Sequence, residues 1–216
     1  MPYFNDEADY QKAARIVGGI RTKWNWPFIV RIRVSEFSFC GGALINSYWV
    51  ITAAHCVAKS AETNESVEMT FGDQVVSDNQ EYGEYHTSSH QFFVHPQYNS
   101  KKALNDIALI KLKEPVRQSP TISPVCLPMA GDKAVPAGTS CFIAGWGAEN
   151  ERYTTGYISD HLLEARVPII KNATCSKSES YDKIFKPEMH ICAGYMTGGN
   201  YRTFIFMSDT RYNHLL

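Results

Sequence analysis

The sequence lacks any stretch of about 18 consecutive apolar residues, so it predicts no transmembrane helix. It also lacks a surplus of charge, because 21 Lys and Arg stand against 22 Asp and Glu, for a formal net charge of -1. This balance disfavours nucleic acid and anionic membrane surfaces as partners. Internal repeats, low-complexity tracts and long amphipathic helices are missing too, which disfavours solenoids, disordered tracts and helical bundles.

A secretory signal is also missing, since residues 1–15 carry acidic side chains and no short apolar run. Six cysteines and the N-glycosylation sequons that begin at Asn64 and Asn172 nevertheless indicate an oxidising, secretory environment. We therefore expect an extracellular protein. The conflict between these signals leads us to expect a segment upstream of the given sequence.

What the sequence contains is a strand pattern, with 44% hydrophobic and 12% aromatic residues available for a core. Apolar residues recur with period two in short runs at 28–34, 67–71 and 163–167, which predicts strands with one buried and one wet face. The more continuously apolar runs at 49–54 and 107–112 predict strands covered on both faces. We expect an all-β sandwich or barrel, with helix only near 54–59 and 173–182.

Short motifs follow one another in a specific order: RIVGG (15–19), FCGGALI (39–45), TAAHC (52–56), NDIALIKL (105–112), CFIAGWG (141–147) and ICAGY (191–195). Together they resemble the chymotrypsin and trypsin family of serine endopeptidases. The resemblance implies a chymotrypsin-like fold of two antiparallel Greek-key β-barrels with the active site between them, of which the second is truncated here. It also implies a pro-segment remnant at 1–15, an incomplete protease domain at 16–199 and a divergent tail at 200–216.

Two motif residues match the family's proton-handling groups. His55 matches the general base, because an imidazole can take up and return a proton near neutral pH. Asp106 matches the carboxylate that orients this ring. Taken singly, each residue also fits a structural role, such as an Asp that caps a turn. The resemblance further implies cleavage after Arg15 by an activating protease, which would free an α-amino group at Ile16.

The nucleophile motif of the family, G-D-S-G-G-P, does not occur, and no serine in the sequence is followed by glycine. Ser208 lacks the flanking glycines that let a backbone turn sharply and present N–H groups to an oxyanion. We expect serine endopeptidase activity on peptide and protein substrates for a full-length parent, but predict that this chain is inactive as given. The alternatives are a non-catalytic homologue that serves as a binding or regulatory module, and an incomplete product of splicing or a frameshift.

The resemblance also assigns the cysteines. It implies the disulfides Cys40–Cys56 and Cys175–Cys192, and it leaves Cys126 and Cys141 unpaired. Spacing alone also permits a bridge between Cys126 and Cys141.

The sequence offers two candidate metal sites, but we expect no metal or other cofactor. Asp73, Glu81 and Glu84 offer oxygen ligands for calcium, but a solvated acidic loop is the simpler interpretation. His86, His90 and His95 do not follow a known zinc-ligand spacing.

Overall fold

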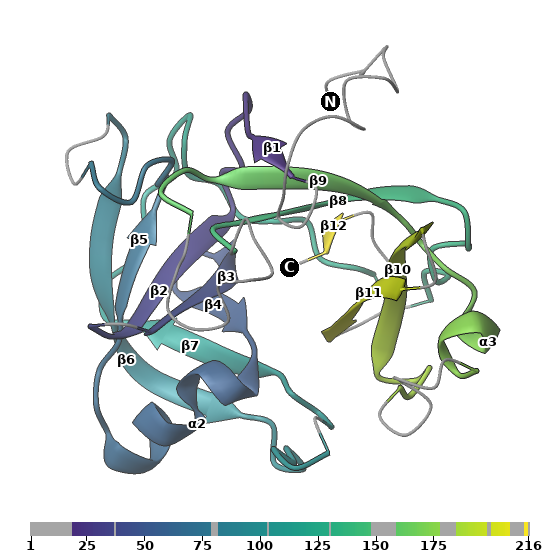
Figure 1. The fold of residues 1–216 in the computed structure, drawn as a ribbon. Helices are drawn as coiled ribbons and strands as arrows, with labels where there is room; N and C mark the ends of the chain where they lie inside the picture. Colours follow the sequence, from purple (N-terminus) through teal and green to yellow (C-terminus); the bar gives the residue numbers. More distant parts are fainter. Residues whose placement is uncertain are drawn as a thin grey trace.

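The chain folds mostly into antiparallel β-strands (Figure 1). The computed structural model describes residues 19–36, 38–78, 82–102, 104–129, 131–147, 159–177, 185–197, 200–207 and 214–215. The expected pro-segment at 1–15, with Arg15, and the neighbouring Ile16 lie outside the described residues. Within the described part, the all-β prediction is confirmed.

Strands from the first half of the chain close into a barrel in the order β2-β3-β4-β7-β6-β5. Every neighbouring pair is antiparallel. The strands are β2 (Ile29–Ser35), β3 (Ser38–Asn46), β4 (Trp49–Thr52), β5 (Glu68–Phe71), β6 (Tyr85–Val94) and β7 (Ala108–Leu112). Figure 1 shows this barrel on the left, with helix α2 (Ala54–Thr63) below it. Closure pairs both edges of each strand, which protects them from other chains.

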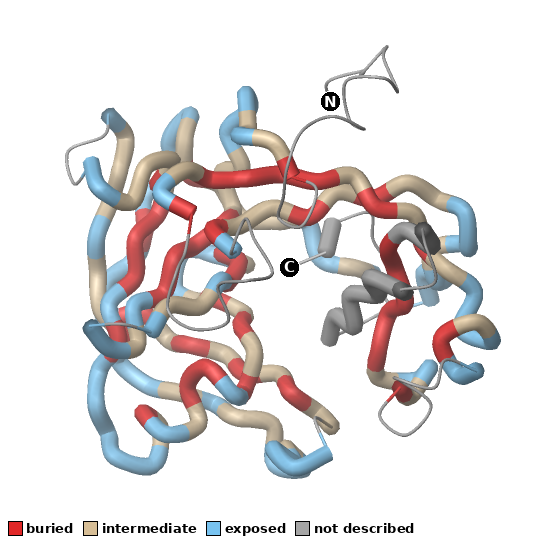
Figure 2. The backbone as a smooth tube through the Cα atoms, viewed as in Figure 1, coloured by how far each residue is buried: buried red, intermediate tan, exposed pale blue. Residues whose placement is uncertain are grey.

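Apolar side chains form the core of the barrel. Figure 2 shows buried segments along its strands. Strand β7 illustrates the alternation, because Ala108, Ile110 and Leu112 are buried and the residues between them are partly exposed. Gly42 on β3 lets the neighbouring strand approach closely. A Cβ at this position would lie 2.9 Å from the carbonyl oxygen of Ile51, too close for any larger residue without a shift of the backbone.

Arg31 departs from the alternating pattern, which had placed it on the wet face of its strand. Its side chain is only 9% exposed, because its Nε is bonded to the Oδ2 of Asp73, whose side chain is fully buried. The guanidinium also lies 5.7 Å from the ring centroid of Phe39. The Arg31 side chain therefore forms a buried ion pair and a cation–π contact, where the alternating pattern predicted contact with solvent.

The helices differ in length from the sequence prediction. Helix α2 runs to Thr63, beyond the expected end at residue 59, and ends at Asn64 in the left-handed conformation (φ 57°). Asn is one of the residues that tolerate this conformation at a helix end. Helix α3 (Asn172–Cys175) is shorter than the expected 173–182, of which 178–182 lies outside the described residues.

The second half of the chain forms two smaller sheets. Strands β8 (Ser140–Gly145) and β9 (Leu163–Pro168) are central in a sheet of order β1-β9-β8-β12, whose outer members are β1 (Ile20–Arg21) and β12 (His214–Leu215). Strands β10 (His190–Thr197) and β11 (Asn200–Met207) form an antiparallel pair, joined to the first sheet by a bridge between Ile169 and Ala193. Among the described residues these sheets do not close into a second barrel. Part of the expected divergent tail, 200–207, is strand β11.

Hydrogen bonds tie the two halves together. The backbone N–H of Val76, beyond the barrel strand β5, donates to the carbonyl of Asp160 (2.8 Å), and that of Leu162 donates to the carbonyl of Gln74 (2.8 Å). The Asp160 carboxylate accepts from the backbone N–H (2.9 Å) and the hydroxyl (3.0 Å) of Ser77. An apolar cluster lies across the same junction, with Ile29, Trp146 and Leu162 at its centre. The segment before β9 is thus fixed to the barrel.

Glu164 on β9 is a second departure from the alternating pattern, which had placed it on the wet face. It is 1% exposed. Its Oε2 accepts hydrogen bonds from Thr22 Oγ1 (2.8 Å) and Trp26 Nε1 (2.9 Å). These donors come from the segment between β1 and β2, which the carboxylate thereby holds against β9.

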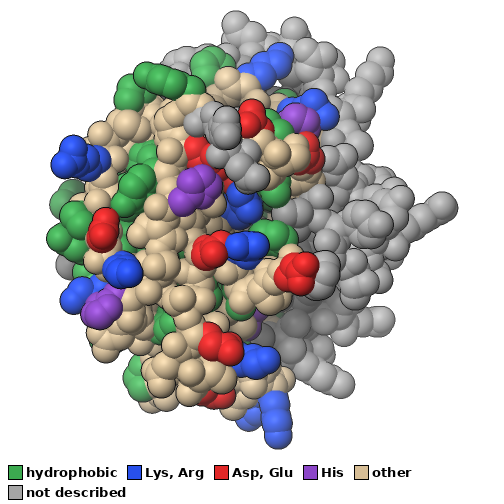
Figure 3. Space-filling view, turned by 90° about the vertical axis from the view of Figure 1, so that its left-hand side faces the viewer, with side chains coloured by type: hydrophobic (Ala, Val, Ile, Leu, Met, Phe, Trp, Pro, Cys, Tyr) green, Lys and Arg blue, Asp and Glu red, His purple; other side chains and the backbone are tan. Residues whose placement is uncertain are grey.

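The surface of the barrel around β5 and β6 mixes charges of both signs. Figure 3 shows acidic, basic and histidine side chains interspersed there, with no large area of one sign among the described residues. This mixture agrees with the formal net charge of -1 and differs from the single-sign surfaces that attract polyanions.

We predict that Asp73→Ala lowers the free energy of unfolding by about 3–5 kcal/mol, because it leaves the buried Arg31 guanidinium without its partner. Glu68→Ala is the matched control. Glu68 on β5 pairs with Arg33 on β2, the strand that also carries Arg31. These two side chains are 65% and 46% exposed, so the loss of Glu68 should cost about 0–1 kcal/mol. Urea unfolding followed by circular dichroism measures both. Equal, small losses would contradict a stabilising buried pair.

Candidate active site

His55 lies in the first turn of helix α2, which begins just after strand β4. The first N–H groups of a helix have no partner within the helix. The residue before the helix, Ala53, has an extended backbone and provides no side-chain cap. The backbone N–H of His55 instead donates to Oδ1 of Asp106 at 2.7 Å. The His55 side chain is 60% exposed, so its ring is open to solvent.

Asp106 reaches this position through strand register. Strands β4 and β7 are antiparallel with Thr52 opposite Ala108, so the residues just after β4 and just before β7 lie together. The Asp106 side chain is 10% exposed, and its Oδ2 lies 2.7 Å from Nδ1 of the His55 ring. One carboxylate therefore accepts two hydrogen bonds from the same residue.

This pair of bonds sets the chemistry of the ring. An ionised carboxylate only accepts, so Nδ1 carries the hydrogen and Nε2 is left as the acceptor. A negative charge is also favourable at the start of a helix. The neighbouring carboxylate stabilises the imidazolium that forms when Nε2 takes up a proton. The arrangement can therefore act as a general base at Nε2.

Two residues that the motif analysis did not select lie near Asp106. Asn105 adopts the left-handed conformation (φ 51°), and its Nδ2 donates to the carbonyl of Gln97 at 2.9 Å. Asn tolerates this conformation better than most residues, so an Asn just before Asp106 was the one signal in the sequence for a left-handed residue there. Tyr98 packs beside the barrel core, and burial together with the negative charge of Asp106 raises the pKa of its phenol.

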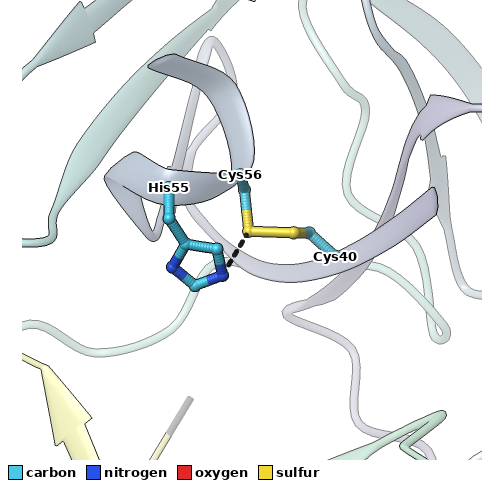
Figure 4. A group of neighbouring side chains, drawn as sticks. All are labelled: Cys40, His55 and Cys56. Carbon is cyan, nitrogen blue, oxygen red and sulfur yellow. Dashed lines mark hydrogen bonds between the residues drawn. A yellow bond between two sulfur atoms is a disulfide. The ribbon is translucent and has the colours of Figure 1, made fainter. Parts of the chain in front are cut away.

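The other ring nitrogen of His55 faces a disulfide. Its Nε2 lies 3.5 Å from Sγ of Cys56, which is bonded to Cys40 on strand β3 (Figure 4). The bridge fixes the first turn of α2 to the barrel wall. With both sulfurs bonded to each other, this group has no thiolate to offer to a metal.

Comparison with known proteins shows the family of this sequence. A protein-family model described as Trypsin matches residues 16–203. The chain belongs to the trypsin family. It is 37% identical over 189 residues to "Serine protease 56" of Mus musculus and 35% identical over 190 residues to "Serine protease 56" of Homo sapiens. Each match covers 86% of this chain but only 29% of the relative, so the chain spans less than a third of the relatives' length.

The trypsin-family disulfides implied by the motifs are both present. Besides the bridge beside His55, Cys175 in helix α3 is bonded to Cys192 on β10. Cys126 is a free, exposed thiol and Cys141 a free, buried thiol. The structure therefore does not form the bridge between Cys126 and Cys141 that spacing alone permitted.

The other residues selected from the sequence lie elsewhere on the described chain or outside the described residues. Asn64 and Asn172 are exposed, at the end of α2 and the start of α3. Ser208 lies outside the described residues, as does Glu81 of the candidate calcium site.

None of the helices within the described ranges is long and apolar enough to cross a membrane.

Several of the candidate metal ligands contact other side chains. Oδ2 of Asp73 forms an ion pair with Nε of Arg31. The carboxylate of Glu84 lies 3.3 Å from Nε2 of His86, whose Nδ1 is 3.2 Å from the hydroxyl of Thr70. Within the described ranges, neither set forms a group of three ligands.

We predict that iodoacetamide modifies Cys126 alone in the native chain, because the thiolate is the reactive form and burial raises the pKa of the Cys141 thiol. Mass spectrometry should find one added group, and a second only after denaturation. Since the folded state favours the neutral Cys141 thiol, stability should also fall as pH rises above about 8.5, where unfolded thiols ionise. Protection of both thiols in the native chain would indicate a bridge between them instead.

Proposed function

We propose that this chain carries the proton-transfer half of a serine endopeptidase site, with His55 as general base and Asp106 as the residue that orients it. The observation that supports this proposal is the Asp106 carboxylate, which accepts from both the backbone N–H and the ring Nδ1 of His55. In peptide hydrolysis, Nε2 would take the proton from an attacking hydroxyl and return it to the leaving amine. Membership of the trypsin family supports proteolysis as the reaction class.

The attacking half of the site is not provided by the given sequence. It contains no serine followed by glycine, and acyl transfer also needs paired N–H donors for the oxyanion. We therefore expect no hydrolysis by the chain as given, and expect activity once a segment that carries the G-D-S-G-G-P motif completes the site. Protein and peptide substrates are proposed for such a complete enzyme.

The proposal also covers how the protein would be activated and where it would be located. Cleavage after Arg15 by an activating protease would separate the pro-segment, 1–15, from a protease domain at 16–199, with 200–216 as a tail. The two disulfides and the exposed sequon residues Asn64 and Asn172 support an extracellular protein that is glycosylated at these positions.

A second candidate function is a non-catalytic binding or regulatory module. It is favoured by a closed first barrel with a well-buried core in a sequence that has no nucleophile motif. Cooperative thermal unfolding of the chain as given would support such a module, whereas a molten state would count against it.

The test of the catalytic proposal compares three proteins, each cleaved after Arg15. They are the chain as given, a version in which residues 200–216 are replaced by a family segment carrying G-D-S-G-G-P, and the same extended version with His55→Ala. Chromogenic peptide esters and an active-site phosphonate label report activity. We predict no labelling of the first, labelling of the second, and a rate at least about 100-fold lower in the third, since general base catalysis is typically worth that much or more.

The extended version with Asp106→Asn serves as a control on the orienting role. It keeps an acceptor for the backbone N–H of His55 and should remain folded, but it should lose activity because a neutral amide stabilises the imidazolium less. An extended enzyme whose rate does not depend on His55 would contradict the proposal, as would specific labelling of the chain as given.

A further inference from the structure

Tyr82 is the most exposed large apolar side chain within the described ranges. It is 95% exposed, and the next values are 72% for Met129 and 50% for Leu127. A tyrosine in a folded protein ordinarily packs its ring against other side chains and keeps only the hydroxyl near water. Tyr82 instead exposes the whole ring from the loop between strands β5 and β6, so its phenol oxygen is accessible to another enzyme.

The protein holds the backbone just after Tyr82 in place. The hydroxyl of Thr121 donates to the carbonyl of Gly83 at 2.9 Å. Gly83 has a φ of 88°, and a Cβ there would lie 2.4 Å from Oγ1 of Thr121. The side chain of Glu84 is 3% exposed, and its carboxylate lies 3.3 Å from Nε2 of His86. The chain therefore enters the protein directly after Tyr82, which leaves this one side chain outside.

Tyr82 also lies in an acidic part of the sequence. Residues 60–100 contain seven Asp and Glu but no Lys or Arg, and Glu81 directly precedes Tyr82. Two of the seven acids pair with arginines of strand β2. Asp78 is exposed, and the carboxylate of Asp160 accepts two hydrogen bonds from the residue before it. Two separate segments therefore contribute acidic side chains to the region of this loop.

An exposed tyrosine among acids suits the transfer of sulfate. The donor in this reaction is a nucleotide that carries sulfate in an anhydride bond to phosphate, so it is an anion and the transferase that binds it needs a cationic site. Charge complementarity then favours an acceptor with acidic neighbours. Tyrosine sulfation takes place in secretory compartments, and the two disulfides of this chain are typical of proteins that pass through them.

Tyr85 provides a matched comparison within the same segment. It also directly follows an acid, Glu84, so the sequence alone would select both tyrosines. Tyr85 begins strand β6 and packs against the barrel core, with its ring centroid 6.3 Å from that of Phe71. Its ring is thus held against the barrel, which limits the access of another enzyme. The structure therefore favours Tyr82 over Tyr85.

We propose that Tyr82 is a tyrosine sulfation site. The phenol oxygen forms a bond to the sulfur of the donor, and the bond between sulfur and the bridging oxygen of the anhydride breaks. The nucleotide leaves with that oxygen and the electron pair, and the phenol proton passes to a base of the transferase. The product is a sulfate ester with a negative charge. This inference rests on the extracellular location proposed above and not on the catalytic role of His55.

The experiment incubates the purified, folded full chain with a tyrosine sulfotransferase and the sulfate donor, and mass spectrometry assigns the sulfate to individual tyrosines. We expect sulfate on Tyr82 that phosphatase does not remove. Tyr82→Phe should abolish sulfation of this segment, whereas Tyr85→Phe should leave it unchanged. The double variant Asp78→Asn/Glu81→Gln should slow transfer at least about 10-fold, the lower end of what charge steering contributes. Transfer should also slow as salt is added.

A second arm examines the chain in cells. The full chain, secreted from cultured animal cells behind a removable signal peptide, should carry sulfate on Tyr82 unless chlorate blocks synthesis of the donor. The purified chain tests the site without any assumption about location, so a failure there leaves the proposed location untouched. Circular dichroism checks that each variant is folded.

Four outcomes would overturn the proposal. These are a Tyr82 that stays unmodified in either arm, equal modification of Tyr85, a modification that phosphatase removes, and a transfer rate that does not depend on Asp78 and Glu81.

Discussion

Asp106 presents one carboxylate to two donors of one residue, and the rest of the candidate site depends on that arrangement. The bond to the backbone N–H satisfies the start of helix α2, where no side-chain cap exists. The bond to Nδ1 fixes the ring that the same helix carries. The same side chain thus satisfies the helix start and orients the ring, and the antiparallel register of strands β4 and β7 brings both residues together.

The structure brings His55 and Asp106, which the sequence selected, into contact, and it adds supporting residues that the sequence did not select. His55 and Asp106 were selected because their motifs, TAAHC and NDIALIKL, occur in the order typical of the family, whereas the role of Asn105 depends on a left-handed backbone that its residue type permits but does not dictate. Period-two alternation predicted the strands and failed at Arg31 and Glu164. Both are charged residues that the pattern assigned to solvent, and both are buried because distant segments supply their partners. Such partners cannot be found from the spacing of one strand.

The two halves of the molecule contribute differently. The first closes into a barrel around a large apolar core and carries both His55 and Asp106. The second has two separate sheets within the described ranges and is joined to the barrel through the junction at residues 74–77 and 160–162. The pair of His55 and Asp106 therefore lies in the half of the fold that closes into a barrel.

The most direct test of the account is the tautomer of the His55 ring, measured by nuclear magnetic resonance on protein with ¹⁵N-labelled histidine. At about pH 9, where histidine side chains are ordinarily neutral, the account predicts a protonated Nδ1 and an unprotonated Nε2 for His55, and loss of this preference in Asp106→Ala. A proton on Nε2 in the unaltered chain would show that Asp106 does not orient the ring and would contradict the account.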